Sequence, residues 1–341
     1  MTIASHSEGP LVVVLDGGYG GTEIEESVLA PFGARVVERP CYGRAAEVRR
    51  AVSGADAVLV RESPVDADAI AAMPGCRAIV RYGVGVDNID RGAATARRIF
   101  VANVPDYGVE EVSDHALALL LAVARRIVWR DRAVRSGAWN IARDEPMHRL
   151  AGGTLGLVGY GRIGQSFHRK ARALGFARTL VFDPFLDSAP DGAELSDLSE
   201  LCIQSDAISL HAPLTGETWH LIGRTQLALM KRTAILVNTS RGGLVDATAL
   251  GEALAENRIF GAGLDVFEEE PPAKDNPLFE LPNVVVSDHT GWYSEESVKD
   301  LRRKASEEIA RVFAGEIPRN WINPWEVEGT YPDGCKQESL T

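Results

Sequence analysis

The second half of the sequence contains three side chains suited to acid–base chemistry on a carbonyl group. Each lies in or directly after an apolar run. Arg241 follows "AILVNTS", Asp265 lies within "GAGLDVF", and His289 follows "VVVSD". Because the carboxyl ends of strands in an open parallel sheet line one ligand crevice, we expect these residues to converge. An arginine can clamp a carboxylate and polarise the adjacent carbonyl, while a histidine can donate a proton to the carbonyl oxygen and take it back. The set predicts carbonyl reduction.

The stretch "GLDVFEEEPP" adds three consecutive glutamates, Glu268, Glu269 and Glu270. A carboxylate beside a histidine orients the imidazole ring and favours its protonated form. A row of like charges is also typical of a solvated turn. The residues themselves do not decide which of the three, if any, has a chemical role.

The segment "LVGYGRIG" places Gly159, Gly161 and Gly164 in G-x-G-x-x-G spacing between an apolar strand and a helix. In that context the tight turn needs the first glycine, close approach of a pyrophosphate needs the second, and contact between helix and strand needs the third. Asp183 ends the next strand, nineteen residues after Gly164. Its carboxylate would accept from ribose hydroxyls and repel a 2′-phosphate, so the pattern predicts NAD rather than NADP. The alternative is a structural α/β turn without a ligand.

The elements that would position these residues alternate between β-rich runs and helical patterns, which indicates right-handed βαβ units and parallel sheets. Strands are predicted over 11–17, 34–40, 57–62, 76–83, 99–105, 154–160, 179–183, 207–212, 233–240, 261–267 and 283–289. One long helix is predicted over 109–129, with an apolar stripe that packs inside its own chain or against a second subunit. His115 on this helix is expected to be a surface or core histidine. A last helix, over 294–315, begins with a serine cap and ends at Gly315.

Composition excludes several other classes of protein. The chain has 341 residues, 45% of them apolar, which favours two globular domains, and its net charge of −12 disfavours nucleic-acid binding. Its four cysteines (Cys41, Cys76, Cys202 and Cys335) have no metal-binding spacing, so no metal is expected and free thiols in a reducing compartment are predicted. Without a signal sequence or a membrane span, we expect a soluble, cytoplasmic protein. The tail after about residue 326 is polar, which is typical of loose order.

Five segments together resemble a known family. "LVGYGRIG", "LHAPLTGETWHLI", "LVNTSRGGLVD", "GAGLDVFEEEPP" and "DHTGWYS" are similar to the signature blocks of the D-isomer-specific 2-hydroxyacid dehydrogenases, in family order, and the resemblance runs from about residue 55 to 325. "RYGVGVDNID" and "HTGWYSEES" look most similar to the branch that contains the C-terminal-binding-protein corepressors and their bacterial enzyme relatives.

The resemblance implies roles for individual residues. The family's catalytic arginine, glutamate and histidine fall on Arg241, Glu270 and His289, which leaves Glu268 and Glu269 as solvated turn residues. The substrate would be bound by Val84, Gly85, Arg241, His289 and Trp292. The cofactor would be bound by Gly159, Gly161, Arg162, Ile163, Gly164, Asp183, His211, Ala212, Pro213, Thr218, Thr239, Ser240, Arg241, Asp265, His289 and Gly291. Asp288 departs from the family, which usually has proline before its histidine, and this puts substrate preference in doubt.

The expected fold is α/β, with two Rossmann- or flavodoxin-like domains. An NAD-binding domain over 107–293 would be inserted into a substrate-binding domain made of 1–106 and 294–341, with the substrate in the cleft between them. The expected function is NAD(H)-dependent, reversible reduction of a 2-keto acid to a D-2-hydroxy acid. Glyoxylate or hydroxypyruvate reduction and phosphoglycerate or phosphite chemistry are alternatives, as is an NAD(H)-sensing binding protein. Formate oxidation is disfavoured because that branch is expected to carry an amide at Glu270. A homodimer is expected to form through the helix and arm over 109–139.

Overall fold

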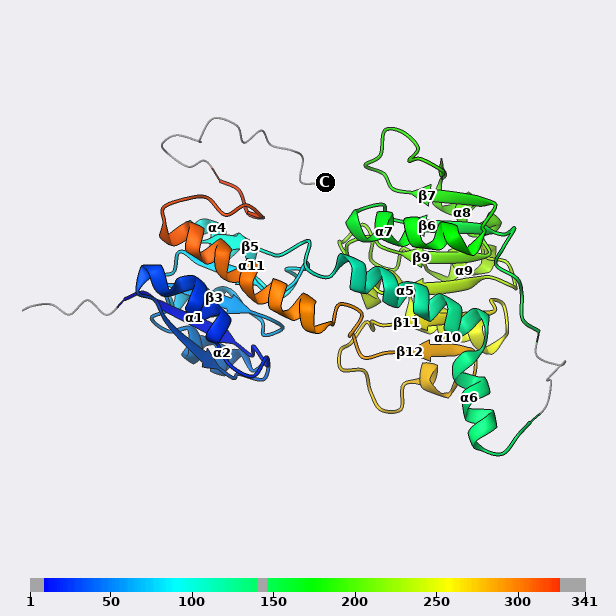
Figure 1. Cartoon of the computed structure of the whole chain (residues 1–341), viewed down its shortest axis with the longest axis horizontal. Helices are drawn as coiled ribbons and strands as arrows, with labels where there is room; N and C mark the ends of the chain where they lie inside the picture. The colour runs from blue at the N-terminus through cyan, green and yellow to red at the C-terminus, as the bar shows by residue number, and fades with distance from the viewer. Residues whose placement is uncertain (1–8, 140–145, 326–341) are drawn as a thin grey trace, which may run out of the picture. The chain divides into compact units, whose positions relative to one another are not determined.

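The computed structural model describes residues 9–139 and 146–325, and it divides into two compact units. The first contains the chain up to Gly108 and again from Ser294, and the second runs from Val109 to Tyr293. Each unit is built around one parallel sheet (Figure 1). Residues 326–341, which include the polar tail and Cys335, lie outside the described residues.

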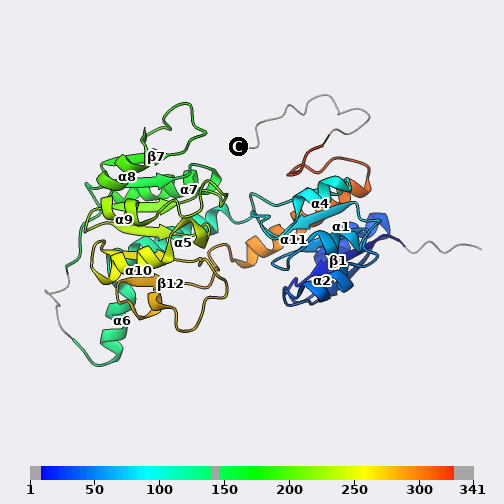
Figure 2. The same ribbon diagram turned by 180° about the vertical axis from the view of Figure 1, so that it is seen from behind.

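The first unit has a five-stranded sheet in the order β2-β1-β3-β4-β5. Its strands are β1 (Leu11–Leu15), β2 (Arg35–Arg39), β3 (Ala57–Val60), β4 (Ala78–Arg81) and β5 (Phe100–Ala102). The central strand β3 is buried along its whole length, because helices cover both faces of the sheet. One face carries α2 (Ala45–Val52), α3 (Ala67–Ala71) and α4 (Arg91–Ala96), and the other carries α1 (Glu23–Leu29) and α11 (Glu295–Phe313) (Figures 1 and 2).

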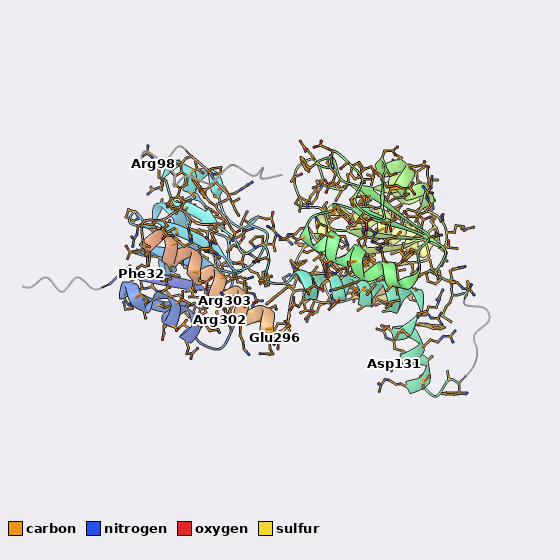
Figure 3. The ribbon with its side chains drawn as sticks, turned by 45° about the horizontal axis from the view of Figure 1, so that its top comes forward. Phe32, Arg98, Asp131, Glu296, Arg302 and Arg303 are labelled. Atoms are coloured by element: carbon orange, nitrogen blue, oxygen red, sulfur yellow. The ribbon has the colours of Figure 1, made fainter. Side chains whose placement is uncertain are left out.

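The long helix α11 joins the first unit through a buried ion pair. Arg302 of α11, labelled in Figure 3, donates to both carboxylate oxygens of Glu25 on α1 at 2.8 and 2.7 Å. The hydroxyl of Tyr82 donates to the same carboxylate at 2.7 Å. Both charged groups are almost fully buried, so each depends on the other for its partner. The chain therefore returns to its first unit through a specific polar contact.

The second unit has a seven-stranded sheet in the order β12-β11-β10-β9-β6-β7-β8. Its strands are β6 (Thr154–Val158), β7 (Arg178–Phe182), β8 (Glu194–Leu195), β9 (Ala207–Leu210), β10 (Ile235–Asn238), β11 (Gly261–Leu264) and β12 (Val284–Val286). Strand order reverses between β6 and β9, which is where doubly wound sheets bind their ligands. On one face lie α5 (Val109–Ala124) and α7 (Arg162–Ala171), and on the other lie α8 (Leu198–Gln204), α9 (Arg224–Leu229) and α10 (Ala247–Ala255) (Figures 1 and 2).

The predicted α/β class is confirmed, and all eleven predicted strands are present. The two-residue strand β8 was not predicted, because "EL" is too short to show an alternating pattern. Single 3-10 turns occupy Ala30–Phe32, Arg172–Leu174, Gly242–Leu244 and Pro277–Glu280. Of the helices in the described part of the chain, none has both the length and the apolar composition needed to cross a bilayer.

The prediction of one helix over 109–129 was wrong. Helix α5 ends at Ala124, Arg126 takes a left-handed conformation with φ of 52°, and a second helix, α6 (Ile127–Arg135), begins there. The break has a physical reason: α5 is held on the sheet by its buried stripe up to Val123 and Ala124, whereas α6 has no buried residue. Helix α6, with Asp131 labelled in Figure 3, extends away from the sheet of its unit.

Candidate active site

The glycine-rich turn after β6 has the geometry that its spacing predicts. Gly159 has φ of 89°, and a Cβ atom there would lie 2.6 Å from the backbone nitrogen of Ala212. A Cβ atom on Gly164 would lie 2.6 Å from the carbonyl oxygen of Gly159, so the helix and strand meet at these glycines. Around Gly161, the N-cap of α7, a Cβ atom would meet nothing within 4 Å. The helix N-terminus is therefore open to a phosphate group, which its amides and dipole favour.

Asp183 lies beside this turn because it follows the neighbouring strand β7. Its Oδ2 atom accepts a hydrogen bond from the backbone nitrogen of Tyr160 at 2.8 Å, and its Oδ1 atom accepts from that of Phe185 at 3.0 Å. The two amides fix the orientation of the carboxylate. Each oxygen keeps further acceptor capacity, which two ribose hydroxyls can use.

The loop after β10 carries Arg241 and packs against the loop that contains Glu268, Glu269 and Glu270. The side chain of Asn238 accepts from the backbone nitrogen of Ser240 at 3.0 Å and donates to the carbonyl oxygen of Arg241 at 2.8 Å, which closes the loop. A Cβ atom on the following residue, Gly242, would lie 1.8 Å from the carbonyl carbon of Phe267. Only glycine allows this approach, so the loops after β10 and β11 pack backbone to backbone.

Glu270 and His289 form a close polar pair. Oε2 of Glu270 lies 2.6 Å from Nδ1 of His289, and Oε1 accepts from the backbone nitrogen of Phe267 at 2.9 Å. Burial raises the pKa of Glu270, but the hydrogen bond and charge of His289, the Phe267 amide and the charge of Arg241 together hold that pKa below its ordinary value. The carboxylate is thus ionised at neutral pH, and it fixes the imidazole through Nδ1. Nε2 remains as the atom that can exchange a proton with a substrate.

The other two glutamates of the row differ from each other. Glu268 accepts from the backbone nitrogen of Ala247 at 2.9 Å and lies 3.0 Å from Nε2 of His220. Glu268 is exposed, in agreement with the prediction of a turn residue, and it also holds the first amide of α10, where helices leave backbone donors without partners. Glu269 is exposed, in agreement with the prediction.

Asp265 is a buried acid that holds the segment His289–Gly291, which we call the histidine loop. Its side chain is 2% exposed. Its carboxylate accepts from the backbone nitrogens of Thr290 at 3.1 Å and Gly291 at 2.9 Å, and its carbonyl oxygen accepts from that of His289 at 2.8 Å. Burial raises its pKa, but hydrogen bonds from His115, Ser287 and Gly291 outweigh burial and lower it.

The residues on either side of His289 are fixed to the same loop. Asp288 is exposed, and its Oδ1 atom accepts from the hydroxyl of Thr290 at 3.0 Å, so it closes the turn at the place where the family usually has proline. The indole of Trp292 donates to the carbonyl oxygen of His289 at 3.0 Å. Both contacts restrain the backbone that carries the imidazole.

Val84 and Gly85 lie in the first unit, in the loop that follows β4 after Tyr82 and Gly83. Gly83 before them has φ of 144°, and Asn103 donates to the carbonyl oxygen of Val84 at 2.6 Å. The side chain of Val84 is 42% exposed. This loop leaves the sheet at its carboxyl edge, where a turn of backbone amides can bind an anion.

Known proteins match this arrangement over most of the chain. A family model described as "D-isomer specific 2-hydroxyacid dehydrogenase, NAD binding domain" matches residues 117–291. A glyoxylate reductase from Korarchaeum cryptofilum is 46% identical over 278 residues, which cover 80% of this chain and 83% of that protein. The chain belongs to the D-isomer-specific 2-hydroxyacid dehydrogenase family. It is an NAD-dependent oxidoreductase that acts on small 2-hydroxy or 2-keto acids, as the sequence predicts.

Two further similarities describe the breadth of this family. A D-3-phosphoglycerate dehydrogenase from Methanocaldococcus jannaschii is 43% identical over 282 residues, which cover 81% of this chain and 53% of that protein. The dehydrogenase thus spans about half the length of that relative. Among solved structures, D-lactate dehydrogenase from Aquifex aeolicus, complexed with NAD and lactic acid, has a TM-score of 0.83 at 25% identity, covering 92% of this chain and 100% of that chain.

The residues of the dehydrogenase fit NAD. Arg162 and Ile163 form the first turn of α7, and His211, Ala212 and Pro213 follow β9. Thr218 donates to the carbonyl oxygen of Pro213 at 2.7 Å. Ser240 donates to the carbonyl oxygen of Leu210 at 2.8 Å, while the hydroxyl of Thr239 is buried without a hydrogen-bond partner. A buried hydroxyl without a partner is costly, and a polar group of a bound cofactor would satisfy it.

Two histidines of the dehydrogenase have surroundings that the sequence does not specify. Both ring nitrogens of His211 are buried without a hydrogen-bond partner, the ring lies 5.1 Å from that of Phe167, and burial lowers its pKa to about 3. His115, expected to be a surface or core histidine, has its Nε2 atom 2.7 Å from the hydroxyl oxygen of Ser287 beside Asp265. From the sequence, a functional role for His115 is only the lesser alternative to a surface or core position.

Proposed function

We propose that the dehydrogenase reduces a 2-keto acid reversibly to a D-2-hydroxy acid, with Arg241, Glu270 and His289 as its catalytic residues. The observation that carries this assignment is the contact of 2.6 Å between Glu270 and His289, together with the effect of the Arg241 charge on the same carboxylate. A cation, an acid and an imidazole at neighbouring strand ends supply what carbonyl reduction needs.

In this mechanism bound NADH supplies the hydride, and the chain supplies orientation and a proton. Arg241 binds the substrate carboxylate with its planar fork of donors and polarises the adjacent carbonyl. Nε2 of His289 donates a proton to the carbonyl oxygen as negative charge develops there. Glu270 stabilises the protonated imidazole through Nδ1 and holds the ring in one orientation. In the reverse direction Nε2 accepts the hydroxyl proton.

We propose Val84 and Gly85 as further contacts of the substrate carboxylate, through backbone amides, and Trp292 as a contact of the substrate side chain. Glyoxylate and hydroxypyruvate are the first candidate substrates. A glyoxylate reductase is 46% identical to this chain over an alignment that covers 80% of it. A small acid of this kind needs little beyond carboxylate and carbonyl recognition. The phosphoglycerate-type reaction is the second candidate, supported by the relative at 43% identity.

The test is stopped-flow oxidation of NADH with a panel of 2-keto acids, carried out on the full chain. We expect turnover with at least one small 2-keto acid, formation of the D-product by chiral chromatography, and near-complete loss of turnover in His289→Ala with NADH binding retained. Tight NADH binding without turnover of any acid would instead support an NAD(H)-sensing binding protein. Turnover like that of wild type in His289→Ala would refute the proposed role of this residue.

We also propose that the dehydrogenase is a cytoplasmic homodimer. Its cysteines Cys41, Cys76 and Cys202 are free and buried, as is usual for proteins of a reducing compartment. Helix α6 and the segment after it expose Ile127, Val134 and Trp139 by 56%, 52% and 89%. Exposed apolar groups gathered on one projecting element favour cover by a second copy of the chain.

A further inference from the structure

Helix α5 lies unusually close to strand β11, and two glycines make this possible. A Cβ atom on Gly261 would lie 2.8 Å from Cγ1 of Val123, and a Cβ atom on Gly263 would lie 2.8 Å from Cβ of Leu119. Residues two apart share a face of a strand, and residues four apart share a face of a helix. The two repeats match, since two residues of strand and four of helix each span roughly 6 to 7 Å.

Two residues further along the strand is Asp265, and four residues back along the helix is His115, so these two residues should also face each other. Nε2 of His115 lies 3.4 Å from Oδ1 of Asp265, so the alignment that packs two apolar side chains on glycine continues into a polar contact. The close approach extends to Gly291 in the histidine loop, where a Cβ atom would lie 2.8 Å from Oδ2 of Asp265 and 3.3 Å from Cδ2 of His115. Helix, strand and loop therefore meet at one point.

Hydrogen-bond direction assigns a proton to Nε2 of His115. The hydroxyl of Ser287 donates to Oδ1 of Asp265 at 2.6 Å, which uses its only hydrogen. The contact of 2.7 Å between Ser287 and His115 must then run the other way, with Nε2 of His115 as donor. His115 thus donates to Ser287, and Ser287 donates to the Asp265 carboxylate, which also accepts from the backbone nitrogens of Thr290 and Gly291.

We propose that His115 is a positioning residue for His289, acting through Ser287 and Asp265, an inference that rests on the proposed function of His289. The loop His289–Gly291 is held by three backbone hydrogen bonds to Asp265. Two of the three, from Thr290 and Gly291, go to the carboxylate, so they hold only while it stays ionised and in one orientation. His115 comes from α5 and is only 27% exposed, and its hydrogen bond to Ser287 keeps the Ser287 hydroxyl directed at Oδ1 of Asp265.

The kinetic test compares His115→Gln, whose side-chain amide keeps a donor, with His115→Leu, which keeps the volume and loses the donor. We expect kcat to fall about tenfold to a hundredfold in His115→Leu, with KM for the keto acid within about twofold of wild type, because ring placement is lost and not binding. His115→Gln should recover to within about threefold of wild type. The matched control is His148→Leu, which removes an exposed histidine beside Phe260 and should leave kcat unchanged.

A double-mutant cycle separates positioning from general loss of stability. If His115 acts through Ser287, the variant His115→Leu/Ser287→Ala should be no slower than the slower single variant, within about threefold. Losses that multiply would overturn the inference, as would a His115→Gln variant no better than His115→Leu. If a variant at position 115 does not fold, Ser287→Ala alone still has to lower kcat for the inference to stand.

A spectroscopic test does not depend on turnover. Long-range ¹H–¹⁵N spectra of histidine-labelled protein, assigned with His115→Gln, should show a proton on Nε2 of His115. A proton on Nδ1 with bare Nε2 would overturn the inference even in an active enzyme. An inactive wild type whose His115 carries the Nε2 proton would instead count against the proposed function and leave the donor chain intact.

Discussion

Both carboxylate oxygens of Glu270 are hydrogen-bonded. Oε2 lies 2.6 Å from Nδ1 of His289, and Oε1 accepts from the backbone nitrogen of Phe267 at 2.9 Å. A carboxylate bound at both oxygens cannot rotate without breaking a hydrogen bond. The imidazole that it contacts is therefore held in one orientation. This relationship distinguishes Glu270 from its two neighbours in the row, and several measurable consequences follow from it and from the surrounding contacts.

Glu270→Gln should lower kcat by about a hundredfold or more, because general acid–base catalysis contributes about 10²- to 10⁴-fold and the amide no longer stabilises the protonated imidazole. NADH affinity should stay within about twofold of wild type. Steady-state kinetics and fluorescence titration measure the two quantities. Glu269→Gln is the matched control, since that side chain is exposed, and a comparable loss in it would contradict the assignment.

Arg241→Lys should raise KM for the keto acid about tenfold and also lower kcat, because a lysine keeps the charge but not the bidentate fork. The measurement is a KM-against-kcat comparison under saturating NADH. The same change at Arg224, which pairs with Glu252 on the surface, serves as the control and should have no effect. An Arg241→Lys enzyme with unaltered KM would show that another cation binds the carboxylate.

Asp183→Ser should shift cofactor preference toward NADPH. Removing the carboxylate removes both its ribose contacts and its repulsion of a 2′-phosphate, so kcat/KM with NADH should fall about tenfold and that with NADPH should rise. Paired assays with the two cofactors give the ratio. Asp187→Ser, four residues further on and exposed, should keep the wild-type ratio. An unchanged ratio in Asp183→Ser would place cofactor choice elsewhere.

His211 should make the folded state sensitive to acid. Its folded pKa of about 3 lies below the ordinary 6.5, so the unfolded chain binds the proton first. Its contribution to stability is therefore constant above pH 6.5 and is lost as pH falls from 6.5 toward 3, by up to about 1.4 kcal/mol per pH unit. His211→Leu should lessen this slope in urea unfolding between pH 6.5 and 4.5. An identical slope in both proteins would contradict the burial of a neutral imidazole.

Ile127→Asp/Val134→Asp should convert a dimer into a monomer, because charged groups on an apolar contact surface oppose association. Sedimentation velocity at several concentrations measures this. The control is Ile203→Asp, which places a charge on a comparably exposed apolar residue of α8. A wild type that is monomeric at every concentration would exclude the proposed dimer.

Much of the fold could be predicted from the sequence because its strands are parallel and buried on both faces. Runs such as Val12–Leu15 and Ala57–Val60 are continuously apolar, and each is bounded by polar or glycine-rich segments. The break at Arg126 could not be predicted, since helix-forming residues continue through it and no glycine marks the left-handed position. Where one helix leaves the sheet depends on the sheet's extent, which a local pattern does not contain.

Site residues could be predicted where a reactive residue type occurs at a motif's spacing. Residues whose contacts depend only on tertiary packing could not be predicted. Glu270 was assigned through the resemblance, and the structure gives it the contact with His289. Glu268 is indistinguishable from Glu269 in sequence, yet only the fold sets its carboxylate at Ala247. The link between His115 and Asp265 follows from helix and strand repeats only once α5 is known to lie on β11. A sequence alone does not state that pairing.

His289 has a φ of 57°, in the left-handed region that only a few per cent of residues other than glycine adopt. Holding a histidine there costs about 1 kcal/mol or more, which the contacts with Asp265 offset. Selection of variants for heat resistance alone would consequently favour His289→Gly or His289→Asn, each with a higher melting temperature and no turnover. Robustness and catalysis thus compete at a single position of this enzyme.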